Sequence, residues 1–415
     1  IIMGAVTVYC VGDWLRFKLK KLPTIAIIAI LGILFTLFTG LLTSFKYLQH
    51  WAPCYDFGIF SQMFNYMKET LQPLTTCERD GLLSHFAVHF SPIYYLLLPF
   101  FFIFPSPVTL LMGQAAIIAS GLIPLYLICK RHKLSNAAVI LFSLCYVLLP
   151  SMANGCFFFL HENKFLTPLI LWLAFALEKN KWIPSVIFTL LLLAVKEDAP
   201  VYAAVLGLYF IVSRRNISKG ALVFVLSIIY FITVSYFMSK YGLGTMSYRY
   251  DNFIYDGSGS LFTVIKAVIL NPIYTVHEAF DEEKIKFILQ MLVPLAFMPL
   301  MIKKPSRIIL LIPFILLNLM SDYTYQHNIN FQYTYGSAAF LFYLMILNYQ
   351  DMKPGFRCKV LAVAATSSIF MFMCNTYYRT SGYESYKTDK NNGAIDIIDD
   401  ALELVPDDSS VAATT

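Results

Sequence analysis

Residues 22–45 (LPTIAIIAILGILFTLFTGLLTSF) form a long run without a single charged side chain. A membrane-spanning helix needs about 20 apolar residues, so this run is long enough to cross a bilayer. Further apolar runs recur along the chain, in which 58% of the residues are hydrophobic and only 13% are charged. A soluble domain could not bury so much apolar surface. The sequence therefore predicts an all-α polytopic membrane protein.

The apolar runs predict about 11 transmembrane helices within residues 1–377. Besides residues 22–45, we expect spans at 108–129, 136–150, 165–177, 182–195, 199–213, 219–238, 287–302, 308–320, 333–348 and 360–377. Several of these runs are shorter than the usual span, which predicts that their outer ends open into a water-filled cavity. Residues 91–104 are apolar but short, and a Pro-Ser-Pro sequence ends them, so we expect a re-entrant or interfacial piece there.

Short basic clusters separate the apolar runs and predict the orientation of the chain. With this threading they all fall on one side, together with residues 13–21 (DWLRFKLKK), while nearly all acids and every histidine except His132 fall on the other. By the positive-inside rule the basic side, including the N-terminus, is cytoplasmic. The clusters are Lys130/Arg131/Lys133, Lys179/Lys181, Arg214/Arg215/Lys219, Lys303/Lys304/Arg307 and Lys353/Arg357/Lys359. Because these basic clusters are short and scattered between apolar runs, they indicate membrane topology. We therefore expect no nucleic-acid partner.

Residues 55–60 (YDFGIF) place Asp56 in the first outer loop, residues 46–90. Apolar side chains then recur at helical spacing from Phe57 to Met67, which predicts an amphipathic helix lying in the membrane interface. A carboxylate held beside a bilayer is a candidate functional group. Aspartate is also a favoured N-cap, so a purely structural role for Asp56 is the alternative.

Residues 196–198 (KED) lie between two short apolar runs without polar residues around them. A charge at membrane depth costs about 2.5–3.5 kcal/mol on insertion scales, so Lys196, Glu197 and Asp198 need partners or water. We expect them to face the cavity, the alternative being a tight turn at the membrane surface.

Histidines on the same side suggest a second set of polar groups. His161 and Glu162 follow three consecutive phenylalanines, and His85 and His89 are four residues apart, as on one helix face. His85, His89 and Glu162 could ligate a divalent metal. A histidine pair is more often hydrogen-bonded, so we predict no metal and keep this set as the alternative.

Arg249 lies between two tyrosines in the outer loop that follows residue 238. Its planar guanidinium could bind a phosphate, the alternative being a solvated loop arginine. Residues 322–327 (DYTYQH) and Gln332-Tyr333 add an aromatic, polar rim that suits sugar rings.

Together these residues resemble the DUF2079 family of bacterial membrane proteins, within the GT-C-type glycosyltransferase superfamily. The likeness covers roughly residues 22–350. Its motifs are residues 55–60, 89–93 (HFSPI), Pro99, 105–107 (PSP), 159–162 (FLHE) and 196–198 (KED). The chain departs from the family pattern in two places, because residues 159–162 lack a proline and Gln332-Tyr333 stands where the family has His-Tyr.

The resemblance implies a GT-C-like bundle with interfacial helices in the first outer loop, a lipid-phosphate sugar donor and a key acid at Asp56. We therefore predict an inverting glycosyltransferase that moves a sugar from a polyprenyl-phosphate donor to a glycan, lipid or protein acceptor. The active site is predicted at the outer face of a bacterial plasma membrane. Asp56 is the predicted general base. The predicted groups for the donor phosphate or sugar are Lys196, Arg249, His89, His161, Glu162, Glu197 and Asp198. The alternatives are a non-enzymatic transporter or flippase of lipid-linked glycans, and a lipid-linked glycan polymerase or ligase.

The last residues, 378–415, change in composition, since acids become frequent and long apolar runs disappear. Helical apolar spacing persists over residues 391–404. We expect residues 378–415 to begin an extracytoplasmic segment that continues beyond Thr415.

Overall fold

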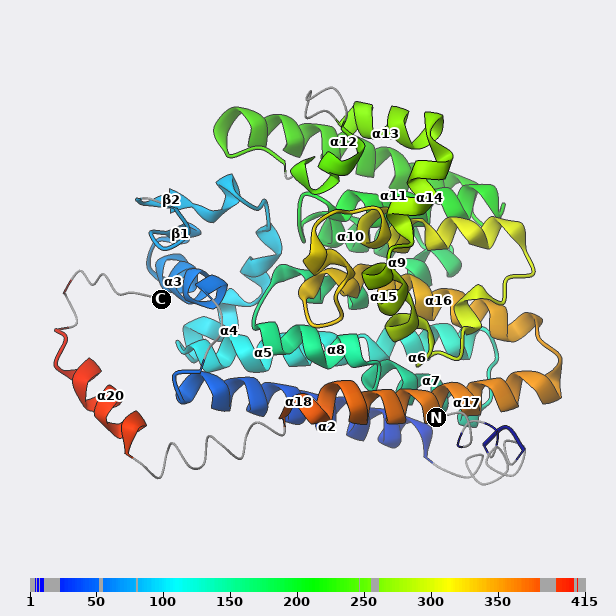
Figure 1. Cartoon of the computed structure of the whole chain (residues 1–415), viewed down its shortest axis with the longest axis horizontal. Helices are drawn as coiled ribbons and strands as arrows, with labels where there is room; N and C mark the ends of the chain where they lie inside the picture. Colours follow the sequence, from blue (N-terminus) through cyan, green and yellow to red (C-terminus); the bar gives the residue numbers. More distant parts are fainter. Residues whose placement is uncertain are drawn as a thin grey trace.

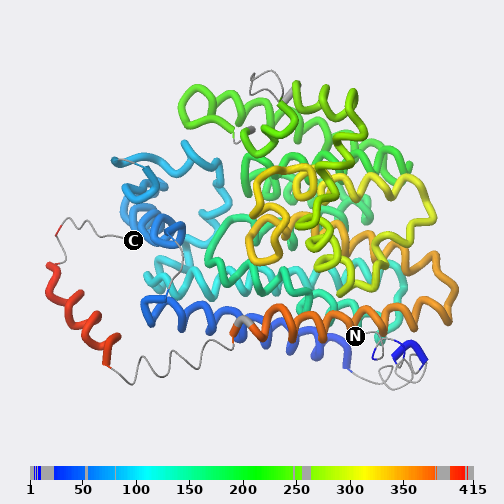
Figure 2. The backbone as a smooth tube through the Cα atoms, in the orientation of Figure 1, coloured from blue at the N-terminus to red at the C-terminus, as the bar shows by residue number. Residues whose placement is uncertain are grey.

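The computed structural model describes residues 4, 6, 8–10, 23–51, 55–79, 81–245, 247–254, 261–380, 393–406 and 409, and most of these residues are helical. The helices run largely along the long axis of the molecule (Figures 1 and 2). The α-helices are α2 (Thr24–Leu48), α3 (Tyr55–Thr70), α4 (Leu98–Ile103), α5 (Pro107–Ser120), α6 (Leu122–Arg131), α7 (Asn136–Val147), α8 (Pro150–Asn154), α9 (Leu166–Glu178), α10 (Trp182–Leu193), α11 (Ala199–Val212), α12 (Ile217–Tyr241), α13 (Leu261–Leu270), α14 (Pro272–Ala279), α15 (Glu282–Leu292), α16 (Tyr335–Asp351), α17 (Pro354–Phe372), α18 (Tyr378–Thr380) and α20 (Ala394–Glu403).

Short 3-10 and π helices join many of these elements. The 3-10 helices are His85–Ala87, Pro92–Leu96, Gly155–Phe158, Glu162–Phe165, Ser247–Phe253, Met298–Leu300, Pro305–Leu311, Thr324–His327 and Gln332–Thr334, and the π helices are Phe314–Leu319 and Met373–Tyr377. Strands β1 (Leu74–Thr75) and β2 (Leu83–Ser84) form a small antiparallel pair in which Leu74 lies opposite Ser84.

Four helices of the described chain are long and apolar enough to cross a membrane: Thr24–Leu48, Pro107–Arg131, Ile217–Tyr241 and Pro354–Tyr377. A bent pair, α7 with Pro150–Phe158, would make a fifth span, with a bend of 44°. The protein is thus a helical membrane protein, but the structure does not confirm about 11 spans. Helix α9 explains part of the difference, because it is buried along almost its whole length. Apolar composition alone does not distinguish a helix that faces lipid from one that faces protein.

The predicted spans 287–302 and 308–320 are not regular α-helices. Helix α15 ends at Leu292, and Ala296 and Phe297 both take positive φ angles. The following chain is built from 3-10 and π segments. Prolines recur at short intervals throughout this stretch, and each removes a backbone donor from a helix.

Helix α16 lies at the centre of the core, since every side chain from Tyr335 to Tyr349 is buried. It packs against α9, while α11 packs closely along α12. The close approach of α11 and α12 requires glycine, because a Cβ atom on Gly207 would lie 2.7 Å from the carbonyl oxygen of Gly220.

Helix α3 is amphipathic as predicted, but its apolar face packs on protein. The Phe57 ring stacks on Phe159 with 5.0 Å between centroids, and Phe64 lies 5.4 Å from Phe101. The structure therefore does not confirm the interfacial position predicted for this helix. Burial of this face within the protein holds Asp56, in the first turn of α3, against the loops of the core.

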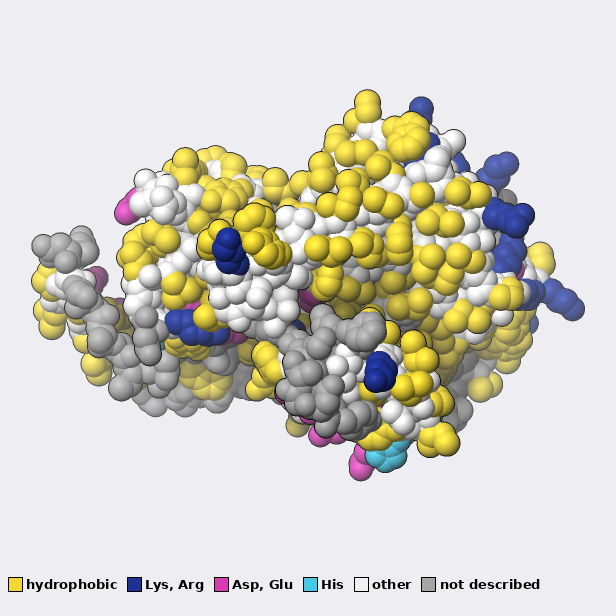
Figure 3. All heavy atoms as spheres, turned by 90° about the horizontal axis from the view of Figure 1, so that it is seen from above, with side chains coloured by type: hydrophobic (Ala, Val, Ile, Leu, Met, Phe, Trp, Pro, Cys, Tyr) yellow, Lys and Arg dark blue, Asp and Glu magenta, His cyan; other side chains and the backbone are white. Residues whose placement is uncertain are grey.

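The two ends of the molecule differ in charge. Seen from above, Lys and Arg side chains gather at the right-hand edge, whereas apolar side chains cover most of this face (Figure 3). In Figure 1 this edge contains the turn between α16 and α17, and α3 and the β1–β2 pair lie at the opposite end of the molecule.

Near the end of the chain, α20 occupies residues predicted to show helical spacing. Its Ile395 is buried, and His50 Nε2 lies 2.8 Å from Asp399 Oδ1. Residues 381–392 and 410–415, on which the predicted C-terminal segment also depends, lie outside the described residues.

Candidate functional site

A cavity of about 260 Å³ lies between α3, the turn before α11 and the segments around Glu162, Arg249 and Tyr333. Most of the site residues predicted from the sequence line it, although they are far apart along the chain. These are Asp56, His85, His89, His161, Glu162, Lys196 and Arg249, and the remaining wall includes Tyr55, Phe60, Glu78, Arg79, Tyr248, Tyr323, Gln332 and Tyr333. Of the predicted residues, Glu197 and Asp198 lie behind this wall.

Asp56 and His161 form a contact in the wall of the cavity. Asp56 Oδ2 lies 3.2 Å from His161 Nε2, and the Asp56 side chain is 41% exposed. The hydrogen bond from His161 holds the pKa of Asp56 below its usual range, against the opposing effect of burial. Asp56 is therefore an ionised carboxylate that solvent reaches.

His161 donates a hydrogen bond to Asp56 from Nε2. An ionised carboxylate only accepts hydrogen bonds, so Nε2 is the donor. Burial, and then the positive charge of Lys164, lower the pKa of His161. The other ring nitrogen, Nδ1, lies 3.4 Å from the Phe159 carbonyl oxygen.

Glu162 and Lys196 form a buried ion pair deeper in the cavity wall. Lys196 Nζ lies 2.7 Å from Glu162 Oε1, and Tyr94 donates to Glu162 Oε2 at 2.7 Å. Burial alone would raise the pKa of Glu162, but Lys196 and then His89 hold it well below its usual range. Burial alone would lower the pKa of Lys196, whereas Glu162 and then Glu197 raise it. Both groups are thus charged.

The two predicted metal-binding histidines are each bound to a separate carboxylate. His85 Nδ1 lies 2.9 Å from Glu78 Oε2, and His89 Nδ1 lies 2.8 Å from Glu197 Oε1. Glu162 is held by Lys196. No group of three His, Cys, Asp or Glu side chains in the described part of the chain is arranged to hold a metal. The alternative metal set is therefore not assembled, because each member has its own partner.

Arg249 packs between aromatic rings on the far wall. Its guanidinium lies 4.8 Å from the Tyr323 ring centroid and 5.0 Å from that of Tyr333, and Nη2 donates to Tyr333 Oη at 3.4 Å. It is buried, so the alternative of a solvated loop arginine does not hold. Behind it, burial raises the pKa of Asp198, while Lys196 opposes this effect.

The backbone beside His161 is strained. Phe159 has φ 60° and ψ −167°, a conformation that a bulky residue rarely adopts and that costs on the order of 1–3 kcal/mol. Lys164, fully buried, donates from Nζ to the Phe159 carbonyl oxygen and so helps to hold this turn. The turn places His161 against Asp56.

Sequence reasoning missed Tyr94, Glu78 and Lys164. Tyr94 lies just after the HFSPI motif, which was a usable signal. Glu78 and Lys164 were missed although their partners, His85 and the Phe159 carbonyl oxygen, are only seven and five residues away along the chain.

Comparison with known proteins supports the family and no finer identity. No curated protein matches the chain. The family described as predicted membrane protein DUF2079 matches residues 49–415, which include the whole cavity. The chain belongs to the DUF2079 family of predicted membrane proteins.

Proposed function

We propose that the protein is an inverting glycosyltransferase of the GT-C type that uses a polyprenyl-phosphate sugar, with Asp56 as its general base. The observation that carries the proposal is the state of Asp56. Its carboxylate is ionised and accessible to solvent. His161 donates a hydrogen bond to Oδ2, while Oδ1 makes no hydrogen bond to any described residue. An orienting bond on one oxygen and an open second oxygen are what a positioned base requires.

In this reaction an acceptor hydroxyl oxygen forms a bond to the anomeric carbon of the sugar. The bond from that carbon to the phosphate oxygen breaks, and polyprenyl phosphate leaves as an anion without needing a proton. The hydroxyl proton passes to Asp56 Oδ1. One carboxylate is therefore enough, and among the described acids that line the cavity Asp56 is the exposed one.

The leaving phosphate gains negative charge in the transition state, so fixed cations beside it lower the barrier. Arg249 and Lys196 both line the cavity. The charge of Lys196 is compensated by Glu162 at 2.7 Å, whereas the guanidinium of Arg249 packs against the rings of Tyr323 and Tyr333. We assign Arg249 the main role toward the phosphate and Lys196 a supporting one.

The size and lining of the cavity suit a sugar. Its volume, about 260 Å³, lies just below the roughly 300–1,000 Å³ typical of small-molecule sites. Three tyrosines, Tyr248, Tyr323 and Tyr333, offer ring faces and hydroxyl groups to such a ligand. The lipid chain of the donor would remain outside, along the apolar surface.

The test uses the purified full chain in lipid nanodiscs, with polyprenyl-phosphate mannose and polyprenyl-phosphate glucose as probes. Release of polyprenyl phosphate, followed by mass spectrometry, reports turnover to an added acceptor or to water. We expect Asp56→Asn to lower turnover by about 10²–10⁴-fold, the usual contribution of a general base. Asp400→Asn, on the exposed face of α20, is the matched control and should keep wild-type turnover.

Two results would contradict the proposal. Wild-type rates with Asp56→Asn would remove Asp56 as the base. Absence of turnover, together with movement of the same lipid probes across proteoliposome membranes, would favour the transporter alternative.

A further inference from the structure

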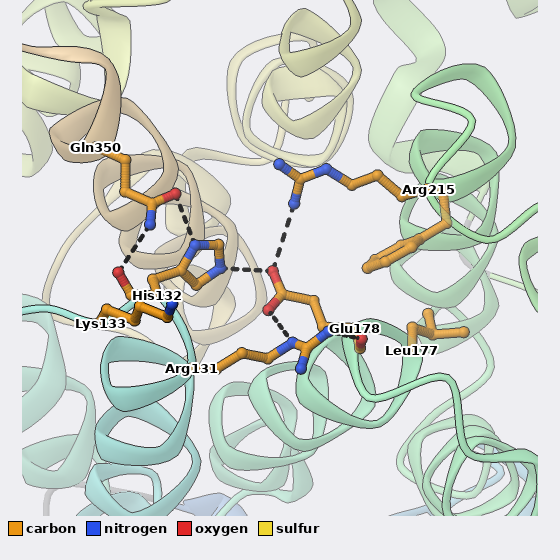
Figure 4. Close-up of a pocket in the computed structure, with 8 residues that line it drawn as sticks. Arg131, His132, Lys133, Leu177, Glu178, Arg215 and Gln350 are labelled. Carbon is orange, nitrogen blue, oxygen red and sulfur yellow. Dashed lines mark hydrogen bonds and ion pairs between the residues drawn. The ribbon is translucent and has the colours of Figure 1, made fainter.

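A second cavity, of about 540 Å³, lies at the opposite end of the helices from Asp56. It is formed where α6, α9 and α16 end and where α11 turns into α12. Its polar lining consists of Arg131, His132, Lys133, Glu178, Arg215 and Gln350 (Figure 4). By the positive-inside rule this is the predicted cytoplasmic end.

Glu178 is the centre of this cavity, and its side chain is only 4% exposed. Arg131 Nε lies 3.2 Å from Glu178 Oε2, and Arg215 Nη1 lies 3.5 Å from Oε1. His132 Nε2 approaches Oε1 to 2.8 Å. Figure 4 shows Arg131, His132 and Arg215 directed at this one carboxylate from different sides.

Both ring nitrogens of His132 face oxygen atoms of other side chains. Gln350 donates from Nε2 to the His132 carbonyl oxygen at 2.9 Å, which leaves Gln350 Oε1 to face His132 Nδ1 at 2.7 Å. The other ring nitrogen faces the Glu178 carboxylate. The His132 ring is thus held in place between Gln350 and Glu178.

The cavity has more positive charge than its own carboxylate can balance. Arg131, Lys133 and Arg215 line it together with the single charge of Glu178. Arg131 and Arg215 remain 38% and 31% exposed, and Lys133 makes no ion pair with a described residue.

Two ordinary explanations leave this excess unexplained. Asp351, the acid at the end of α16, is paired with Arg307 at 2.6 Å and therefore does not balance the positive charge of the cavity. Cations also stabilise the C-terminal ends of helices, and Arg131 does donate to the Glu178 carbonyl oxygen. That contact occupies part of one guanidinium and does not account for Lys133 or Arg215.

We propose that this cavity binds the phosphate group of an anionic ligand. Arginine forks and a lysine together suit phosphate oxygens, and the volume leaves room for a small group attached to the phosphate. Two sources share this chemistry. One is the headgroup of an anionic lipid in the adjacent leaflet, because basic pockets between helices on this side bind such headgroups. The other is a soluble phosphate compound.

The experiment titrates the delipidated full chain, in uncharged detergent, with two probes. Binding of phosphatidylglycerol is measured by native mass spectrometry against phosphatidylcholine with the same acyl chains. Binding of inorganic pyrophosphate is measured by calorimetry. We expect the double variant Arg131→Gln/Arg215→Gln to lower the affinity for the probe that binds by at least about tenfold, since two charged hydrogen-bond donors are lost. The probe that shows this loss identifies the source.

The matched control removes the same charge nearby without touching the cavity. Lys179→Gln/Lys181→Gln alters two exposed lysines of the same end that are not part of the lining. We expect less than about a twofold change, because exposed charges are screened. Lys133→Gln leaves the Glu178 contacts intact and should weaken binding about threefold, so the test does not depend on folding of the double arginine variant. Glu178→Gln should tighten binding, because it removes the competing anion.

The proposal is overturned if phosphatidylglycerol binds no better than phosphatidylcholine and calorimetry detects no binding of pyrophosphate. It is equally overturned if the lysine control weakens binding as much as the arginine variant, since the effect would then reflect general surface charge.

Discussion

Lys196 Nζ lies 2.7 Å from Glu162 Oε1, and both side chains are almost completely buried. The two residues come from turns preceding different helices, and Tyr94 completes the contact by donating to the second Glu162 oxygen. An ion pair formed inside the protein is favourable only as a pair, because each charge alone would be costly to bury. The main role of Lys196 is therefore structural, as the ion-pair partner of Glu162, and binding a phosphate would be a second role.

This pair gives a stability prediction. Glu162→Gln leaves Lys196 buried without its anion, and Lys196→Met does the converse, so each should lower stability by about 3–5 kcal/mol. The double variant Glu162→Gln/Lys196→Met should lose less than the sum, since neither member of the pair is then left charged without the other. Thermal unfolding of the four proteins in detergent measures this coupling. Additive losses would show that the two residues act independently.

Arg249 should be sensitive even to replacement by another cation. Arg249→Lys keeps the charge but loses the planar contact with Tyr323 and Tyr333. We expect the KM for polyprenyl-phosphate mannose to rise about tenfold, the equivalent of roughly 1.4 kcal/mol. Arg214→Lys, an exposed change outside the cavity, is the control. An unchanged KM would exclude Arg249 from donor binding.

The pH dependence of turnover should depend on His161. The pKa of Asp56 lies below its usual value of about 3.9, so the base is ionised above that pH and lost only as the pH falls through the lowered pKa. His161→Phe removes the hydrogen bond but keeps a ring beside Phe158, and it should therefore move the acid limb of the pH–rate profile to higher pH. His277→Gln, at an exposed site, should leave the limb in place. A limb that moves to lower pH in His161→Phe would contradict the assigned contact.

The orientation of the chain can be tested with single cysteines. Gln72 and Asn180 are both exposed, and they lie in turns that the sequence predicts to be on opposite sides of the membrane. In a background without the eight native cysteines, Gln72→Cys should react with an impermeant maleimide on intact cells. Asn180→Cys should react only after permeabilisation. The reverse pattern would invert the topology and place the Asp56 cavity inside the cell.

Residue pattern alone was enough to identify a helical membrane protein, since no soluble fold can bury apolar runs such as residues 22–45. It also identified the polar residues around one cavity, because charges such as Lys196 and Glu162 stand out among apolar residues. Helix α3 was predicted from its periodicity, and its apolar face is indeed buried, although against protein.

Only the tertiary structure decided which apolar helices form the core and which contacts each charge makes. Helices α9 and α16 are as apolar as a membrane span, but they lie inside the protein, and hydrophobicity is the same whether lipid or protein covers it. The partner of an ion depends on distances between segments far apart in sequence, as between His89 and Glu197. The cavity around Glu178 arises in the same way, because the basic clusters that indicate topology converge only when the ends of separate helices are packed together.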